Sequence, residues 1–264
     1  NKGWAFLKEA KDLPSVFPAD WEIIHVPHTW NNVDGMDGGA DYFRGTCYYA
    51  KIIKKSELPE ADCYYLEING ANSSADVYVN GKHLTHHDGG YSTFRVNLTE
   101  ELTEETLIVI AVDNAPNDKV YPQVADFTFY GGIYRDVNLV AVSESHFDLD
   151  YFGGKGVVIT PVIDGTNARI KIEAFVTNKK DTQKVRVTLK DACGETVAWG
   201  ISTNTVMEME ITNVHRWHGR KDPYLYRCEV ELLEGENIID SISDRFGCRT
   251  FCIDPEKGFI LNDE

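Results

Sequence analysis

The chain has 264 residues, enough for two domains of ordinary size that each bury a core. Apolar residues make up 42% and aromatic residues 11%, which is typical of compact domains and excludes a disordered chain. The formal net charge of -16 makes nucleic acid and anionic membranes unfavourable partners, because their phosphate groups carry the same sign.

In the first half of the chain, apolar and polar residues alternate. Over 75–80 the alternation places Ala75, Val77 and Val79 on one face, which predicts a strand with one buried side. Asn80-Gly81 follows at once and predicts a tight hairpin, because both residues tolerate positive φ. Gly-rich turns at 88–90 and 130–132 punctuate further segments. We expect antiparallel strands joined by long loops.

The second half alternates more regularly, and the change falls near 143–146. One strand is predicted over 169–176 with Ile170, Ile172, Ala174 and Val176 inside, and others over 207–211 and 228–232. Five or more evenly spaced strands over about a hundred residues indicate an immunoglobulin-like sandwich. Since no segment has the pattern of an amphipathic helix, the fold class is predicted to be all-β.

The cysteines and histidines suggest no disulfide framework and no metal site. None of the six cysteines forms a Cys-x-x-Cys pair, and none lies at ligand spacing from a histidine pair. We expect reduced, mostly buried thiols and structural or surface histidines, which favours a cytoplasmic protein. The longest aliphatic runs, such as 107–112, are far too short to cross a bilayer.

Eight short segments, in order along the chain, resemble glycoside hydrolase family 2. They are Pro-His-Thr-Trp at 27–30, the segments 41–49, 70–81 and 88–94, Asp113-Asn114, the segment 126–136, Trp217 with Pro-Tyr-Leu-Tyr at 223–226, and the segment 244–264. Tyr48 stands where tryptophan is usual in the family. Each segment alone is a weak signal, but together and in this order they make a specific one.

The resemblance implies a jelly-roll sugar-binding domain over 1–143, an immunoglobulin-like sandwich over 144–253, and a lead-in over 254–264 to a TIM barrel outside the chain. It implies a non-catalytic portion of a retaining β-galactosidase, whose two catalytic glutamates lie on barrel strands, so no catalytic residue is predicted here. Implied partners are a β-galactoside, the protein's own barrel and a second copy of the enzyme. The alternatives are a β-glucuronidase, a β-mannosidase, or a stand-alone carbohydrate-binding module.

The resemblance also implies where sugar contacts lie. In the family, the aspartate that matches Asp126 enters the active site from the accessory domain, and in some β-galactosidases it helps to hold sodium; sodium or magnesium is the ion implied for the full-length enzyme. Its carboxylate would accept hydrogen bonds from vicinal hydroxyls beside aromatic rings. Asp41 and Tyr42 stand near the position of the family's sugar-contacting asparagine, and Arg44 suits an acidic sugar. The structural alternatives are a loop-capping role for Asp126 and a solvated loop for the others.

Overall fold

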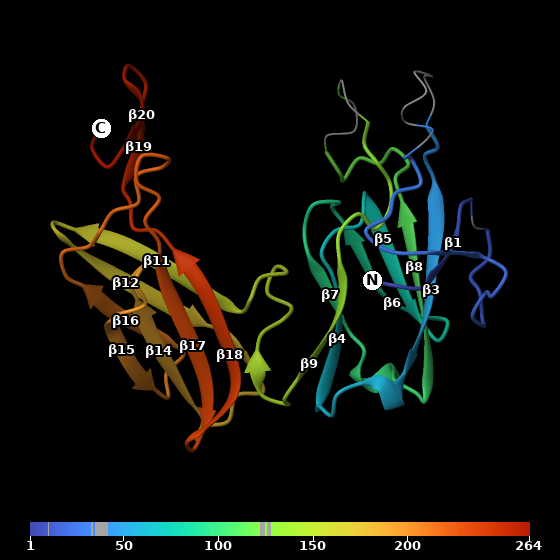
Figure 1. Cartoon of the computed structure of the whole chain (residues 1–264), viewed down its shortest axis with the longest axis horizontal. Coiled ribbons are helices and arrows are strands. Elements are labelled where there is room, and N and C mark those ends of the chain that lie inside the picture. The colour runs from blue at the N-terminus through green and yellow to red at the C-terminus, as the bar shows by residue number, and fades with distance from the viewer. Residues whose placement is uncertain (10, 33, 35–41, 122–124, 126–127) are drawn as a thin grey trace. The chain divides into compact units, whose positions relative to one another are not determined.

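The computed structural model describes residues 1–9, 11–32, 34, 42–121, 125 and 128–264. Within these residues the chain is all-β, with many strands and two short 3-10 turns at Lys55–Glu57 and Thr99–Glu101, which confirms the predicted class. It separates into two compact units, Asn1–Val142 and Ser143–Glu264 (Figure 1). No helix in the described ranges is long and apolar enough to span a membrane.

Two antiparallel sheets face one another in the first unit. The larger sheet has the order β2-β1-β3-β8-β5-β6, and the smaller has the order β7-β4-β9. The bounds are β1 Trp4–Leu7, β2 Glu22–Ile24, β3 Thr46–Lys54, β4 Cys63–Ile68, β5 Ser74–Val79, β6 Lys82–Asp88, β7 Phe94–Asn97, β8 Glu105–Asp113 and β9 Val137–Val142.

Strand β8 is buried on both faces. Ile108, Ile110 and Val112 belong to the main core between the two sheets. Leu107 and Val109 belong to a second apolar cluster, which includes residues of β1 and β3 on the other side of the large sheet. This double burial explains why 107–112 is a continuous apolar run rather than an alternating one.

The second unit is a sandwich of a three-stranded and a four-stranded sheet. Their orders are β11-β12-β16 and β15-β14-β17-β18, all antiparallel. Two small two-stranded ladders accompany them, β10 with β13 and the hairpin of β19 with β20. The bounds are β10 His146–Phe147, β11 Val157–Asp164, β12 Asn167–Ala174, β13 Val176–Thr177, β14 Lys184–Lys190, β15 Thr196–Ser202, β16 Val206–Ile211, β17 Tyr226–Glu234, β18 Asn237–Phe246, β19 Phe251–Asp254 and β20 Gly258–Leu261.

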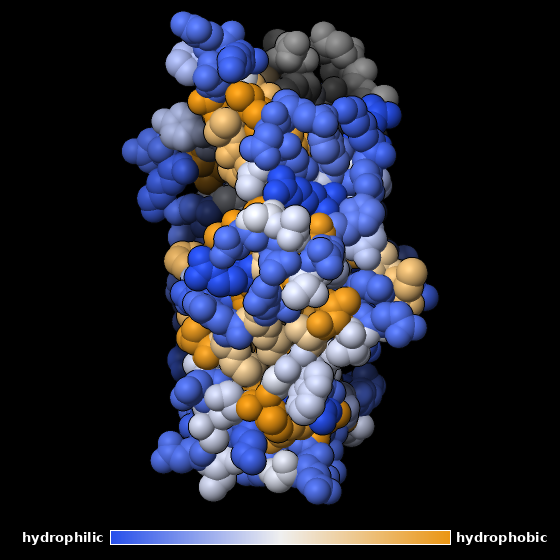
Figure 2. Space-filling model, turned by 90° about the vertical axis from the view of Figure 1, so that its left-hand side faces the viewer, coloured by the Kyte–Doolittle hydropathy of each residue, from blue (hydrophilic) through white to orange (hydrophobic). Residues whose placement is uncertain are grey.

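The alternation in the sequence matches this sandwich closely. Ile170, Ile172 and Ala174 of β12 are buried between the sheets, as predicted, whereas Val176 lies beyond the strand and is half-buried. The surface of this unit is polar with scattered exposed apolar side chains, which appear as orange among blue on the side shown in Figure 2.

All six cysteines are free thiols, as predicted, but they are not all inside. Cys47, Cys228 and Cys248 are buried, whereas Cys193 and Cys252 are exposed. Burial raises the pKa of Cys47 and of Cys228 to about 12, which keeps both thiols protonated and unreactive at neutral pH.

Candidate functional site

A hollow of about 350 Å³ opens among the loops of the first unit. Four loops contribute to it: the one after β2, the one between β4 and β5, the one between β6 and β7, and the one between β8 and β9. Its lining is largely aromatic and consists of Thr29, Asn72, Tyr91, Thr128, Phe129, Tyr130 and Tyr134. A monosaccharide-sized ligand suits this volume, and aromatic walls suit the C–H faces of a sugar ring.

Backbone contacts fix the floor of the hollow. Asn72 and Gly132 exchange two backbone hydrogen bonds, with N···O distances of 3.0 and 3.2 Å, and Asn72 Nδ2 donates to Tyr130 O at 2.8 Å. A Cβ on Gly131 would lie 2.1 Å from Cζ2 of Trp30, and one on Gly132 would lie 2.4 Å from His28 O. These two positions therefore require glycine.

Two tyrosines form one wall. The hydroxyl of Tyr134 donates to Gly90 O, and the rings of Tyr91 and Tyr134 meet edge to face with centroids 6.5 Å apart. Arg135 holds both, since Nη1 donates to Tyr91 O at 3.0 Å and its guanidinium lies 5.2 Å from the Tyr134 centroid. Burial raises the pKa of Tyr134, so this hydroxyl stays protonated as a donor.

A buried amide network lies beneath these loops. Asn31 is 0% exposed, and its Oδ1 accepts from Gly131 N at 2.8 Å and from Asn114 Nδ2 at 3.2 Å. Its Nδ2 donates to Phe43 O at 2.9 Å and to the Asp34 carboxylate at 3.1 Å. The network joins the β2–β3 and β8–β9 connections, which are distant in sequence, and it holds the Gly131 backbone under the hollow.

Arg44 lies beside the hollow. It lines a small recess that shares Asn72, Tyr91 and Phe129 with the hollow. Its Nε donates to Asn114 O at 2.9 Å, and its guanidinium carbon lies 5.8 Å from the ring centroid of Tyr42. The recess therefore has a cation held at its edge.

The predicted sugar-contacting residues are only partly within the described chain. Asp126 and Asp41 lie outside the described residues, although Thr128, Phe129 and Tyr130, which follow Asp126 directly, line the hollow. Tyr42 is described and contacts Arg44, but it is not among the lining residues. Over the described ranges, no group of three His, Cys, Asp or Glu side chains could hold a metal ion.

Sequence reasoning did not single out Asn72, Tyr91 or Tyr134 as site residues. All three fall inside the segments that carry the family resemblance, at 70–81, 88–94 and 126–136. Their position within those segments could have marked them, but only the fold shows that three separate loops converge on one hollow.

Comparisons with known proteins agree with the fold. The family model "Glycosyl hydrolases family 2, sugar binding domain" matches residues 23–143, and "Glycosyl hydrolases family 2" matches residues 155–249. The chain therefore belongs to glycosyl hydrolase family 2.

Individual relatives extend the match to nearly the whole chain. A β-glucuronidase of Bacteroides fragilis is 30% identical over 92% of this chain and 37% of its own length. The β-galactosidase BoGH2A of Bacteroides ovatus is 28% identical over 99% of this chain and 32% of its own length. The crystal structure of an FMN-binding β-glucuronidase from Facaelibacterium prausnitzii L2-6 matches with a TM-score of 0.89 at 37% identity, over 100% of this chain and 41% of that one. The chain thus spans about a third of the length of the curated relatives.

Proposed function

We propose that this chain supplies the sugar-binding and immunoglobulin-like domains of a retaining β-glycosidase that acts on terminal β-glucuronides. The observation that carries the proposal is the aromatic hollow formed by the segment that follows Asp126. In this proposal the loop around Asp126 reaches the sugar, and the catalytic carboxyl groups belong to a barrel domain outside the 264 residues. The domains are then 1–143 and 144–253, and 254–264 leads into the barrel.

Two observations favour a glucuronide. Relatives named β-glucuronidase match 92% and 100% of the chain with identities of 30% and 29%. Arg44 lines the recess beside the hollow, where a guanidinium complements the carboxylate of an acidic sugar. A β-galactoside is the second candidate, because a relative named β-galactosidase covers 99% of the chain and because most of the lining is uncharged.

The hairpin of β19 and β20 supports the presence of a further domain. Its face exposes Phe251, Ile253 and Phe259, with Ile253 78% exposed and the two phenylalanine rings stacked 5.8 Å apart. The base of the hairpin is fixed, because Asn262 Nδ2 donates to Trp217 O at 2.9 Å. A rigid two-stranded hairpin with one apolar face needs a partner surface, which a barrel domain would provide.

The test is made in the full-length enzyme with p-nitrophenyl β-glucuronide and p-nitrophenyl β-galactoside. We expect Asp126→Ala to lower kcat/KM about ten- to a hundredfold, because a charged hydrogen-bond partner contributes about 1.5–3 kcal/mol. Asp118→Ala, which removes an exposed carboxylate from the same β8–β9 connection, should leave kcat/KM unchanged. Unchanged kinetics in Asp126→Ala would refute the sugar contact. A wild-type preference for the galactoside would refute the choice of glucuronide and leave the glycosidase proposal intact.

A further inference from the structure

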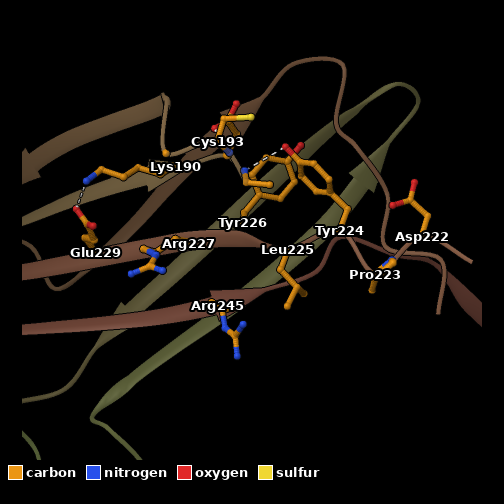
Figure 3. A pocket seen from close by; sticks show the side chains of 13 residues that line it. Lys190, Cys193, Asp222, Pro223, Tyr224, Leu225, Tyr226, Arg227, Glu229 and Arg245 are labelled. Atoms are coloured by element: carbon orange, nitrogen blue, oxygen red, sulfur yellow. Dashed lines mark hydrogen bonds and ion pairs between the residues drawn. The ribbon is translucent and has the colours of Figure 1, made fainter. Parts of the chain in front are cut away.

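A second hollow, of about 720 Å³, opens on the second unit, next to the β14–β15 turn and the segment that enters β17 (Figure 3). It is distinct from the aromatic hollow, since the two share no lining residue. Its lining consists of Lys190, Asp191, Ala192, Cys193, Gly194, Asp222, Pro223, Tyr224, Leu225, Tyr226, Arg227, Glu229 and Arg245.

Three basic residues form a row across this hollow. Lys190 of β14 pairs with Arg227 of β17, and Arg227 pairs with Arg245 of β18. Directly paired residues share a face of a sheet, and their chain neighbours Leu189, Cys228 and Phe246 are buried in the core. The row therefore lies on the outer face, and Figure 3 shows the side chains of Arg227 and Arg245 directed to the same side of the ribbon.

Among the residues that the structure describes, two of these three cations lack a counterion. Lys190 Nζ lies 2.7 Å from Glu229 Oε2, which neutralises it. Neither Arg227 nor Arg245 forms an ion pair with any residue that the structure describes. Like charges directly opposite one another on a sheet are destabilising. The chain has 42 acidic and only 26 basic residues, so carboxylates that could neutralise the two arginines are abundant in its sequence. The pair is therefore set up to receive an external anion, which two guanidinium groups can bind with several hydrogen bonds.

The remainder of the face suits a sugar. Trp199 of β15 is paired with Thr188 of β14. Because Thr188 and Lys190 are two residues apart on the same strand, all three side chains are on the outer face. Trp199 is 67% exposed and offers a flat apolar ring beside the cations.

We propose that the outer face of the β15-β14-β17-β18 sheet binds a uronate-bearing oligosaccharide, with a carboxylate at Arg227 and Arg245 and a pyranose ring on Trp199. The strands β15 and β18 are three spacings apart, or about 14 Å, so one chain of several sugars is needed to reach both positions. Between Trp199 and the two arginines lies Glu229, whose carboxylate is paired with Lys190. Its negative charge disfavours a second carboxylate of the ligand at this position. The choice of a sugar rests on the proposed function, whereas the anion site rests on the two arginines alone.

The test is a calorimetric titration of the 264-residue chain with a tetrasaccharide of galacturonic acid, and with maltotetraose as the uncharged probe. We expect saturable binding of the acidic probe only, which weakens as salt is raised to about 0.5 M. Arg227→Gln should weaken it about threefold to tenfold, as should Arg245→Gln. The matched control is Arg169→Gln, which removes the same charge from an exposed position on β12 of the other sheet.

The opposite results are equally clear. Absence of binding, equal binding of maltotetraose, or an equal loss in Arg169→Gln would overturn the inference. Tighter binding of sulfated maltotetraose, which carries sulfate groups but no carboxylate, would overturn the choice of a uronate. Tyr91→Ala, in the hollow of the first unit, separates the two proposals. If Tyr91→Ala abolishes binding and Arg227→Gln does not, this inference fails while the proposed function stands.

Discussion

Replacement of Asn31 by alanine tests whether the buried amide network supports the sugar-binding hollow. The substitution removes the acceptor of Gly131 N–H, which has no room to turn elsewhere, since its Cα lies against Trp30. Asn114 Nδ2, which also donates to Asn31, retains Phe43 O as an acceptor at 3.4 Å, and Phe43 O still accepts from Trp30 Nε1 at 3.3 Å. The Gly131 N–H is therefore the one donor that loses its partner. One orphaned buried donor costs about 1–3 kcal/mol, and the lost side-chain atoms leave a small cavity that costs about 1 kcal/mol more. We expect a total of about 2–4 kcal/mol.

Urea denaturation with hydrogen exchange read by mass spectrometry measures this loss for each unit separately. With an m-value of about 2 kcal/mol/M, the midpoint of the first unit should fall by about 1–2 M. The second unit should be unaffected. The control is Asn97→Ala, which removes an exposed side chain whose Oδ1 accepts from Thr99 N at 2.9 Å. A loss in Asn31→Ala no larger than in this control, or an equal loss in both units, would refute the reasoning.

Two further predictions concern the sheets of the first unit. The ring of His86 lies between two carboxylates, with Nδ1 3.0 Å from Asp76 Oδ1 and Nε2 3.0 Å from Asp88 Oδ1, and the hydrogen bond to Asp76 raises its pKa. A raised pKa stabilises the fold below the unfolded value of about 6.5, and this stability is lost as pH rises through the folded value. In urea titrations, His86→Gln should therefore destabilise the protein more at about pH 5.5 than at about pH 8.5. An equal effect at both pH values would contradict this. Arg95 Nε donates to Glu67 Oε2 at 2.8 Å across β7 and β4, with both side chains largely buried. Arg95→Ala should lower the melting temperature of this unit by several degrees, because about 1–3 kcal/mol is lost when the Glu67 carboxylate loses its partner; a change under one degree would show that the pair is solvent-screened.

The strands could be predicted from the sequence because their signal is local. Alternation over 169–174 and 228–232 places the inward residues correctly, since each strand of an antiparallel sandwich has one face in the core. The apolar run 107–112 gives no such signal, because its strand is buried on both sides. The burial of β8 depends on which strands flank it and on the segment that covers the outer side of the large sheet.

The site was less accessible to sequence reasoning. The resemblance directed attention to Asp126, Asp41 and Tyr42, whereas the described hollow is also lined by Asn72 and Tyr91 from two other loops and by Tyr134 further along the β8–β9 connection. A sugar site is a convergence of loops, and convergence cannot be read from spacing along the chain. The row of Lys190, Arg227 and Arg245 has the same origin, since residues 18 and more positions apart become neighbours only through strand register.

The sequence by itself thus determined the all-β class and the family, because alternation, turn residues and short motifs act over a few residues each. The sequence marked 130–132 as a turn, but the reason why residues 131 and 132 must be glycine, the closeness of Trp30 and His28, follows only from the fold. Only the tertiary structure decided which side chains share a hollow, which charges remain unpaired, and which apolar faces stay open. These properties depend on contacts between distant segments, and such contacts exist only when the sheets have formed.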